Sequence, residues 1–236
     1  MSNNNDIVTI DGVDFRPHRN GGGLVAVTAR VVASAYVGPK AKVLGRAHIG
    51  DRAKIYDTAR VGGNARVYGR AKVHGNARVG GNARVYDEAE VYGSAQVYGD
   101  AEVYGGARIY ESAQVYGSAR VLHEAKVYGS AQVYGDAEVY NWATVSGQAM
   151  ICNKAKVKNE AKVYGQAKVY GQARVVGEAE VYGQAEVYGN AEVAGRAKVH
   201  GNAVIYDYAV VRGNAIVRGN ARVGDRARVG KGEVTR

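Results

Sequence analysis

This 236-residue chain has a single cysteine and no long apolar run, and each of these features excludes a class of protein. The single cysteine, Cys152, excludes a disulfide framework and suits a cytosolic chain. No apolar run is long enough to span a membrane, and the polar start at residues 1–5 is unlike a signal peptide. We therefore expect a cytoplasmic protein with no membrane partner.

What the chain does contain is a six-residue repeat that runs from residue 29 to residue 229 without a break. Alanine occupies every sixth position from Ala29 to Ala227, and Val or Ile follows two residues later. Residues two apart lie on one face of a strand, so the pattern predicts a buried face of Ala and Val. The residue between them, mostly charged or Gln, should point outward. An uninterrupted repeat also favours a single domain.

A turn is predicted after every strand. The position two residues after Val is Gly in most units and Asp or Asn in most others, and these residues accept left-handed backbone angles. From residue 45 to residue 231, only Glu111, His123 and Lys231 depart from this rule. Frequent Gly and β-branched Val exclude a helix, collagen needs Gly at every third position, and a hairpin meander turns every 8–12 residues. A coil of short strands, each stacked on the strand one coil below, remains.

The unit at residues 97–101, an aliphatic residue with a small residue four positions on, resembles the hexapeptide-repeat superfamily, the left-handed parallel β-helix. The glycine run at residues 21–23 is similar to that of YdcK-type and phage-encoded hexapeptide-repeat proteins. This resemblance implies an all-β, single-domain triangular solenoid with three repeats to a coil, here about 11 coils of 18 residues. The left hand comes from the resemblance alone, because the general rule for parallel crossovers predicts a right hand.

We divide the chain into an N-terminal cap at 1–24, a β-helix at 25–230 and a C-terminal tail at 231–236. Alternation from Ile7 to Phe15 around Asp11 and Gly12 predicts a hairpin. A loop should follow it. A cap covers the open end of a solenoid, which otherwise exposes core and unpaired strand edges.

Positive charge is concentrated near the N-terminal end of the β-helix. The chain has a net charge of +10, and residues 40–84 hold 11 basic residues against Asp51 and Asp57. We predict a basic patch, spread over all three walls, made of Arg46, Arg52, Lys54, Arg60, Arg66, Arg70, Lys72, Arg78 and Arg84. Nucleic-acid binding is one interpretation of this patch, and a solvated surface is the other.

Residues 18 apart should be neighbours on one wall. One wall then alternates in charge through Arg84, Glu102, Arg120, Glu138 and Lys156. Most tyrosines directly follow the Val or Ile of a unit, and we call this the ladder position. Tyrosines there should stack in ladders in the same way, and His74 and His200 occupy ladder positions too. Opposite charges and stacked rings on adjacent strands are stabilising, so both patterns indicate a structural role.

Two regions break the pattern and are our candidates for an interaction surface. The first is the coil at 141–158, which contains Trp142, Met150 and Cys152. The second places Val204, Val210 and Ile216 at outward positions. From these we expect a protein partner and a homo-oligomer, either a trimer or a dimer.

Many proteins of the superfamily are acyltransferases with a catalytic His, and one branch binds zinc through three His. Here His123, beside Glu124, is the candidate for a general base. No close His pair suggests a metal site, and Cys152 has no activating partner in the sequence. We predict no cofactor and no metal.

The sequence thus favours a non-enzymatic rigid scaffold or binding protein, with a phage or prophage accessory role implied by resemblance only. The alternatives are an acyltransferase that uses acyl-CoA and a nucleic-acid binder that uses the basic coils.

Overall fold

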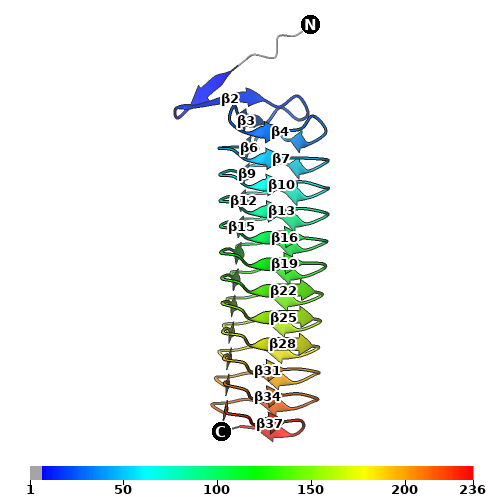
Figure 1. The fold of residues 1–236 in the computed structure, drawn as a ribbon, viewed down its shortest axis with the longest axis vertical. Coiled ribbons are helices and arrows are strands. Elements are labelled where there is room, and N and C mark those ends of the chain that lie inside the picture. The colour runs from blue at the N-terminus through cyan, green and yellow to red at the C-terminus, as the bar shows by residue number, and fades with distance from the viewer. Residues whose placement is uncertain (1–6, 236) are drawn as a thin grey trace.

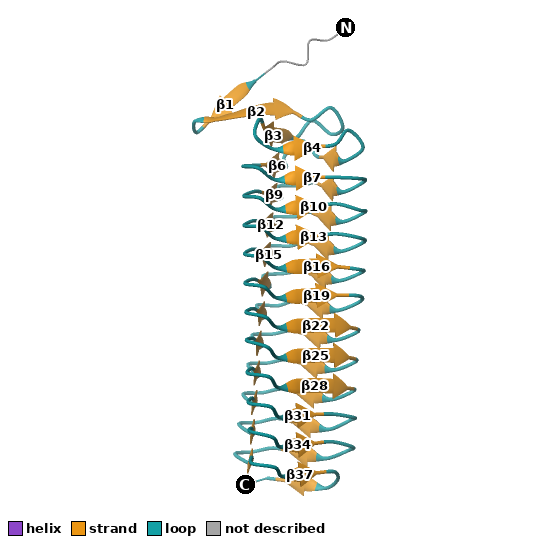
Figure 2. Ribbon diagram, in the orientation of Figure 1, coloured by secondary structure: helices purple, strands orange, loops and turns teal. Residues whose placement is uncertain are grey.

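The computed structural model describes residues 7–235 as a straight rod built from strands (Figure 1). Residues 1–6 of the expected cap and residue 236 of the expected tail lie outside the described residues. Strands and connecting turns make up the whole of the described chain (Figure 2). They form three sheets that run the length of the rod, one for each wall of a triangular solenoid.

The first sheet contains the N-terminal hairpin and one strand from each coil. Its order is β1 (Val8–Ile10), β2 (Val13–Pro17), β3 (Leu24–Ala26), β6 (Lys42–Val43), β9 (Arg60–Val61), β12 (Arg78–Val79), β15 (Gln96–Val97), β18 (Gln114–Val115), β21 (Gln132–Val133), β24 (Met150–Ile151), β27 (Lys168–Val169), β30 (Glu186–Val187), β33 (Val204–Ile205) and β36 (Arg222–Val223).

The second sheet is parallel throughout. It contains β4 (Arg30–Val31), β7 (His48–Ile49), β10 (Arg66–Val67), β13 (Arg84–Val85), β16 (Glu102–Tyr104), β19 (Arg120–Leu122), β22 (Glu138–Asn141), β25 (Lys156–Asn159), β28 (Arg174–Gly177), β31 (Glu192–Val193), β34 (Val210–Val211) and β37 (Arg228–Val229).

The third sheet is parallel as well. It contains β5 (Tyr36–Val37), β8 (Lys54–Ile55), β11 (Lys72–Val73), β14 (Glu90–Val91), β17 (Arg108–Ile109), β20 (Lys126–Val127), β23 (Thr144–Val145), β26 (Lys162–Val163), β29 (Glu180–Val181), β32 (Lys198–Val199), β35 (Ile216–Val217) and β38 (Glu233–Val234). With 12 strands in each of the last two sheets, the rod has about 12 turns, against the 11 expected.

The predicted interior is confirmed. The repeated Ala and Val or Ile side chains form one buried cluster, and the largest fully buried side chains are isoleucines such as Ile109. Phe15 of β2, 3% exposed, packs against the N-terminal end of this cluster. The core is therefore thin and uniform along the rod.

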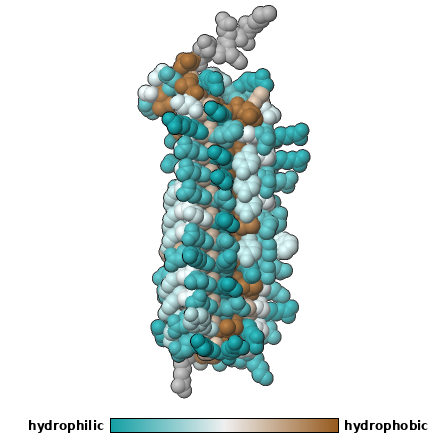
Figure 3. Space-filling model, viewed as in Figure 1, coloured by the Kyte–Doolittle hydropathy of each residue, from teal (hydrophilic) through white to brown (hydrophobic). Residues whose placement is uncertain are grey.

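The N-terminal hairpin is also confirmed. β1 and β2 pair antiparallel with Val8 opposite Phe15, and the turn residues Asp11 and Gly12 both have positive φ, as a two-residue hairpin turn requires. β2 pairs antiparallel with β3, and β3 pairs parallel with β6, so the hairpin continues the first sheet over the end of the rod. The cap leaves hydrophobic side chains exposed, which Figure 3 shows gathered at that end.

The C-terminal end departs from the expected tail. β38 pairs with β35, so the third sheet continues into residues that the sequence placed outside the β-helix. Its register joins Ile216 to Glu233, which are 17 residues apart instead of 18. Gly232, with φ +81°, takes the left-handed conformation in place of Lys231, which explains why Lys231 departs from the corner rule.

The other two exceptions to the corner rule keep the left-handed conformation, with φ of 58° at Glu111 and 59° at His123. A corner carboxylate accepts a hydrogen bond from the backbone N–H of the corner one coil further on. Asp51 accepts from Gly69 at 2.9 Å, and Glu111 accepts from Gly129 at 2.9 Å. This bond satisfies a donor outside the sheet ladder and stabilises an otherwise unfavourable residue at the corner.

Two adjacent glycines, Gly80 and Gly81, differ in backbone conformation and in the space around them. Gly81 has φ +63°, and a Cβ there would lie 2.7 Å from the Gly99 nitrogen, whereas a Cβ on Gly80 would meet no atom within 4 Å.

We predict that Gly81→Ala lowers the free energy of unfolding by about 1–3 kcal/mol, because it adds backbone strain and steric overlap. Gly80→Ala should change it by less than about 0.5 kcal/mol. Chemical denaturation of both variants tests this, and equal losses would contradict the assignment.

Candidate functional site

The outward residues of the first coils form columns of like charge on all three sheets. On the first sheet Lys42, Arg60 and Arg78 lie on adjacent strands in register. On the third sheet Lys54 lies beside Lys72 in the same way. Like charges opposite one another destabilise a sheet, so these columns need a reason other than stability.

The second sheet begins with a basic column of the same kind. Arg30, His48, Arg66 and Arg84 follow one another on β4, β7, β10 and β13. The predicted patch therefore surrounds the rod on three sides, as the sequence indicated.

From Arg84 to Lys156 the second sheet treats the same positions differently, although like charges also meet elsewhere in the rod, as at Arg108 and Lys126. On the second sheet the charges alternate, and Glu102 lies 3.2 Å from Arg84 and 3.9 Å from Arg120. Glu138 lies 3.9 Å from Arg120 and 2.9 Å from Lys156. The predicted alternating column is confirmed, and it shows that the fold accommodates interleaved charges at these positions.

The nine patch residues divide into two groups. Arg70, Lys72 and Arg84 form ion pairs with Glu88, Glu90 and Glu102. Within residues 7–235 the other six have no carboxylate within ion-pair distance: Arg46, Arg52, Lys54, Arg60, Arg66 and Arg78. All six are exposed, so their charges face solvent.

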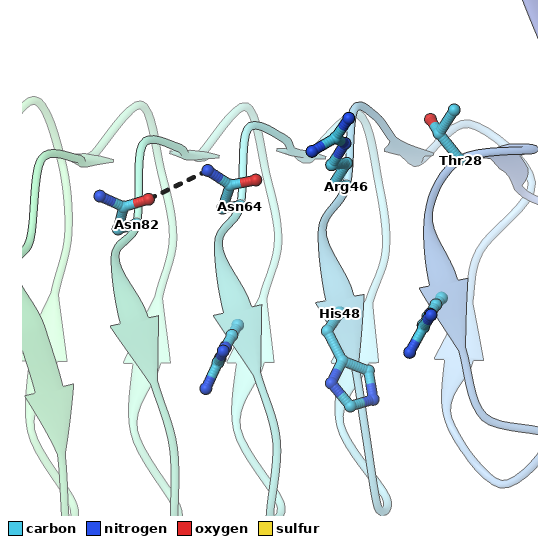
Figure 4. Close-up of a pocket in the computed structure, with 7 residues that line it drawn as sticks. Thr28, Arg46, His48, Asn64 and Asn82 are labelled. Carbon is cyan, nitrogen blue, oxygen red and sulfur yellow. Dashed lines mark hydrogen bonds between the residues drawn. The ribbon is translucent and has the colours of Figure 1, made fainter.

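A cleft of about 730 Å³ opens over the second sheet within this basic region (Figure 4). Two rows of side chains line it. The corner row consists of Thr28, Arg46, Asn64 and Asn82, and the strand row consists of Arg30, His48 and Arg66. In Figure 4 the Asn64 amide donates a hydrogen bond of 3.1 Å to the Asn82 side-chain oxygen. With three arginines and no acidic residue in its lining, this cleft suits an anion.

Two neighbouring clefts have a similar character. One, of about 650 Å³, lies over the third sheet and combines Arg52, Lys54 and Lys72 with two tyrosines, Tyr36 and Tyr56. The other, of about 430 Å³, is lined by Val32, His48, Gly50, Asp51, Arg66, Tyr68 and Arg84. Sequence reasoning found the cations but missed Arg30, His48 and the clefts. The 18-residue spacing of Arg30, His48 and Arg66 was the signal that could have identified their shared column.

The predicted tyrosine ladders are confirmed on all three walls. Ring centroids of successive tyrosines lie 4.7–5.0 Å apart where regular stacking holds, as at Tyr86–Tyr104 and Tyr68–Tyr86. His74 stacks between Tyr56 at 4.5 Å and Tyr92 at 5.1 Å, and burial lowers its pKa, so it acts as a neutral ring of the ladder. His200 stacks on Tyr182 at 4.6 Å.

The ladders are interrupted in the coil at 141–158, one of the two expected interaction surfaces. Ser146 and Cys152 occupy ladder positions, between Tyr128 and Tyr164 and between Tyr134 and Tyr170 respectively. Trp142, at a corner, is 64% exposed, whereas Met150 and Cys152 are half-buried. Val204, Val210 and Ile216 lie one on each sheet and are half-buried. Both surfaces stay predictions of partner contact.

His123 lies in a row of corner side chains. Its Nδ1 atom lies 2.9 Å from the Asn141 side-chain oxygen, and the Asn141 amide donates a 2.9 Å hydrogen bond to Asn159. This row gives His123 a structural role at a left-handed corner. Its assignment as a general base stays an untested alternative.

Two further features bear on function, namely clusters of metal-binding side chains and membrane-spanning helices. Among the residues that the structure describes, no group of three or more His, Cys, Asp and Glu side chains is placed to hold a metal ion. Nor does any helix in residues 7–235 have the length and apolar character needed to cross a membrane.

The geometry defines an all-β triangular solenoid with a basic N-terminal end. A sequence model of the YdcK β-solenoid repeat matches residues 59–75 and 95–111, so these two segments are similar to that repeat. The matched segments lie in the regular coils. A comparison with curated proteins finds no match.

The tyrosine ladders predict how stability depends on pH. Burial raises the pKa of Tyr104, burial and Glu186 raise that of Tyr170 to about 12, and Cys152 together with burial raises that of Tyr134 to about 12. Because the folded state holds these protons more tightly, their stabilisation is complete below the unfolded pKa near 10 and is lost as pH rises towards 12. We expect the unfolding midpoint to fall steeply above pH 10.

Tyrosinate absorbance near 295 nm provides the measurement. The folded protein should titrate at higher pH than the same chain in denaturant. Overlapping titration curves would contradict the assignment of the rings as a desolvated ladder.

Proposed function

We propose that this chain is a non-enzymatic rigid rod that serves as a binding scaffold, and that its basic N-terminal coils bind an anionic partner. The observation that supports this is the difference between the two halves of one wall. Charges alternate and pair from Arg84 to Lys156, whereas the column before it is cationic from Arg30 to Arg84 apart from His48. The fold tolerates interleaved charges, so the column of like charges before Glu102 is best explained by an external anion.

The architecture suits a scaffold because its backbone is bonded from coil to coil. Arg66 N–H donates to Ala83 C=O at 2.9 Å, and Tyr68 N–H donates to Val85 C=O at 3.1 Å. The same pattern recurs through the described coils. A rod held in this way presents side chains at fixed intervals of one strand spacing, roughly 4.8 Å.

The charge distribution favours an extended anion over a small one. Six unpaired cations lie on three walls over several coils, and the cleft over the second sheet adds Arg30. An anionic polymer that follows the rod would contact several of these cations and release its own counterions, which makes such binding strong at low salt.

Other parts of the functional hypothesis rest on separate features. Self-association as a dimer or trimer would use the Trp142 surface or the Val204, Val210 and Ile216 surface. A cytoplasmic location and a phage or prophage accessory role stay proposals that rest on composition and resemblance.

Removing cations should weaken binding in a salt-dependent manner. With fluorescein-labelled inorganic polyphosphate as the probe, we expect Arg46→Gln and Arg66→Gln each to raise Kd several-fold and to reduce the slope of log Kd against log salt by roughly one. Arg120→Gln is the matched control, because Arg120 is paired with Glu102 and Glu138. Fluorescence anisotropy at several salt concentrations measures both quantities. An unchanged slope in the first two variants would refute anion binding at this surface.

The acyltransferase alternative has a direct test. A ligand present at 100 times its Kd stabilises a protein by about 2.7 kcal/mol, so an enzyme that binds acetyl-CoA should show a clear thermal shift, and His123→Ala should abolish any transfer. Acetyl-CoA also carries phosphates and an adenine ring that the basic clefts could bind, so adenosine 3′,5′-bisphosphate is the control. We expect acetyl-CoA to give no larger shift than this control and His123→Ala to leave polyphosphate binding unchanged. A shift of several degrees that the control does not reproduce would replace the scaffold proposal by the enzyme.

A further inference from the structure

Each tyrosine ladder begins in the basic region at 40–84 or in the next coil, with a ring that is stacked on its C-terminal side. Tyr56 stacks on His74, Tyr68 on Tyr86, and Tyr98 on Tyr116 at 4.9 Å with an interplanar angle of 1°. One coil earlier, the ladder position is glycine in all three columns: Gly38, Gly50 and Gly80. Among the described residues, these three rings therefore have no aromatic partner on the N-terminal side.

The first sheet has the longest gap. Gly62 and Gly80 occupy two consecutive ladder positions between Leu44 and Tyr98, and neither has the positive φ that would require glycine. A Cβ on Gly80 would meet no atom within 4 Å. The Tyr98 side of the gap is open, and Tyr98 is 37% exposed, in contrast to the half-buried Tyr116 behind it.

This gap is a cleft of about 370 Å³. Its floor is formed by Gly62, Gly80 and the buried Val79, and its two ends are formed by Leu44 and the Tyr98 ring. Three strand spacings separate the ends, which is about 14 Å. A Cβ on Gly62 would lie 3.3 Å from the Leu44 Cβ, whereas the position at Gly80, next to the Tyr98 ring, is free. The Gly80 position therefore leaves room for a planar ring stacked on Tyr98.

Cations line one side of the cleft. Arg60 and Arg78 are exposed, lie on adjacent strands and have no ion-pair partner within residues 7–235. Lys42 extends the same column by one strand. The cleft thus combines an open aromatic face with a row of unpaired positive charges. The clefts at Tyr56 and Tyr68 also place a tyrosine beside cations, but Lys72 and Arg84 in them are ion-paired, so the cleft at Tyr98 has the stronger case.

We propose that the cleft at Gly62, Gly80 and Tyr98 is a stacking site for the bases of single-stranded nucleic acid, with the phosphates held by Arg60 and Arg78. The inference rests on the proposed function and names the class of anion. Single-stranded nucleic acid supplies planar bases for the aromatic face of the cleft and regularly spaced phosphates for its row of cations, so one polymer matches both features. A duplex hides the faces of its bases, and polyphosphate has none.

The glycine positions allow the cleft to be filled without changing charge. Gly80→Tyr restores the residue that the ladder has at Tyr98 and Tyr116, and should fold with an unfolding midpoint at or above that of the wild type. Tyr98→Leu removes the stacking face instead. Ala194→Tyr is the matched control, because it adds a ring at an equivalent ladder position on the second sheet, far from the basic coils.

The probes are fluorescein-labelled oligo(dT) of 20 nucleotides and a DNA hairpin with the same number of phosphates, measured by anisotropy with the full chain. We expect the wild type to bind the single strand more tightly than the hairpin. Gly80→Tyr and Tyr98→Leu should each weaken single-strand binding about fivefold or more, leave polyphosphate binding unchanged, and differ from Ala194→Tyr, which should match the wild type.

The possible outcomes distinguish the stacking site from the proposed anion-binding function on which it rests. Polyphosphate binding with no preference for the single strand, or a Gly80→Tyr variant that binds the single strand as tightly as the wild type, would overturn the stacking site and leave the anion-binding scaffold intact. Failure of polyphosphate and of both DNA probes to bind would overturn both.

Discussion

The structure depends on one constraint, the backbone hydrogen bonding that places each residue over the residue 18 positions further along the chain. Pairs such as Arg66 with Arg84 and Val67 with Val85 show this register, which holds from β3 to the last turn. The constraint leaves room inside only for small side chains, hence Ala, Val and Ile. It also places a left-handed residue at every corner from Gly45 to Asp225, and Glu111 and His123 accept that conformation with help from side-chain hydrogen bonds.

The same constraint stacks the outward side chains of successive coils on one another. A residue at one outward position is beside its counterparts above and below at roughly 4.8 Å, so tyrosines become ladders and charges become columns. Alternating charges contribute a few tenths of a kcal/mol for each pair, and like charges cost a similar amount. The middle of the rod follows the stabilising pattern at Glu102 and Glu138. The N-terminal coils do not, and an anionic partner would supply the missing negative charge.

Most of the fold could be predicted from the sequence because the repeat is local and regular. The strands, the core, the hairpin around Asp11 and Gly12 and the ladders all follow from periods of two, six and 18 residues. The hand of the coil came from resemblance, not from the residues. The change of register at Glu233 was missed, because it depends on how Gly232 turns the chain after the repeat ends.

The candidate site was only half predictable. The cations were visible as a charge excess, and the register of the repeat places Gly80 at a ladder position and Gly81 at a corner. The clefts depend on how far the neighbouring side chains extend, so only the structure shows that the space at Gly80 is open. Likewise, ion pairing divided the nine basic residues into two groups that the sequence treats alike.

The most direct test of the central claim is to measure stability and anion binding together in Arg60→Glu. A glutamate at this position would lie between Lys42 and Arg78, as Glu102 lies between Arg84 and Arg120. If the column is retained for an anion at the expense of stability, the variant should unfold at a higher temperature than the wild type and bind polyphosphate more weakly. A variant that is less stable, or that binds polyphosphate as tightly as the wild type, would contradict the account.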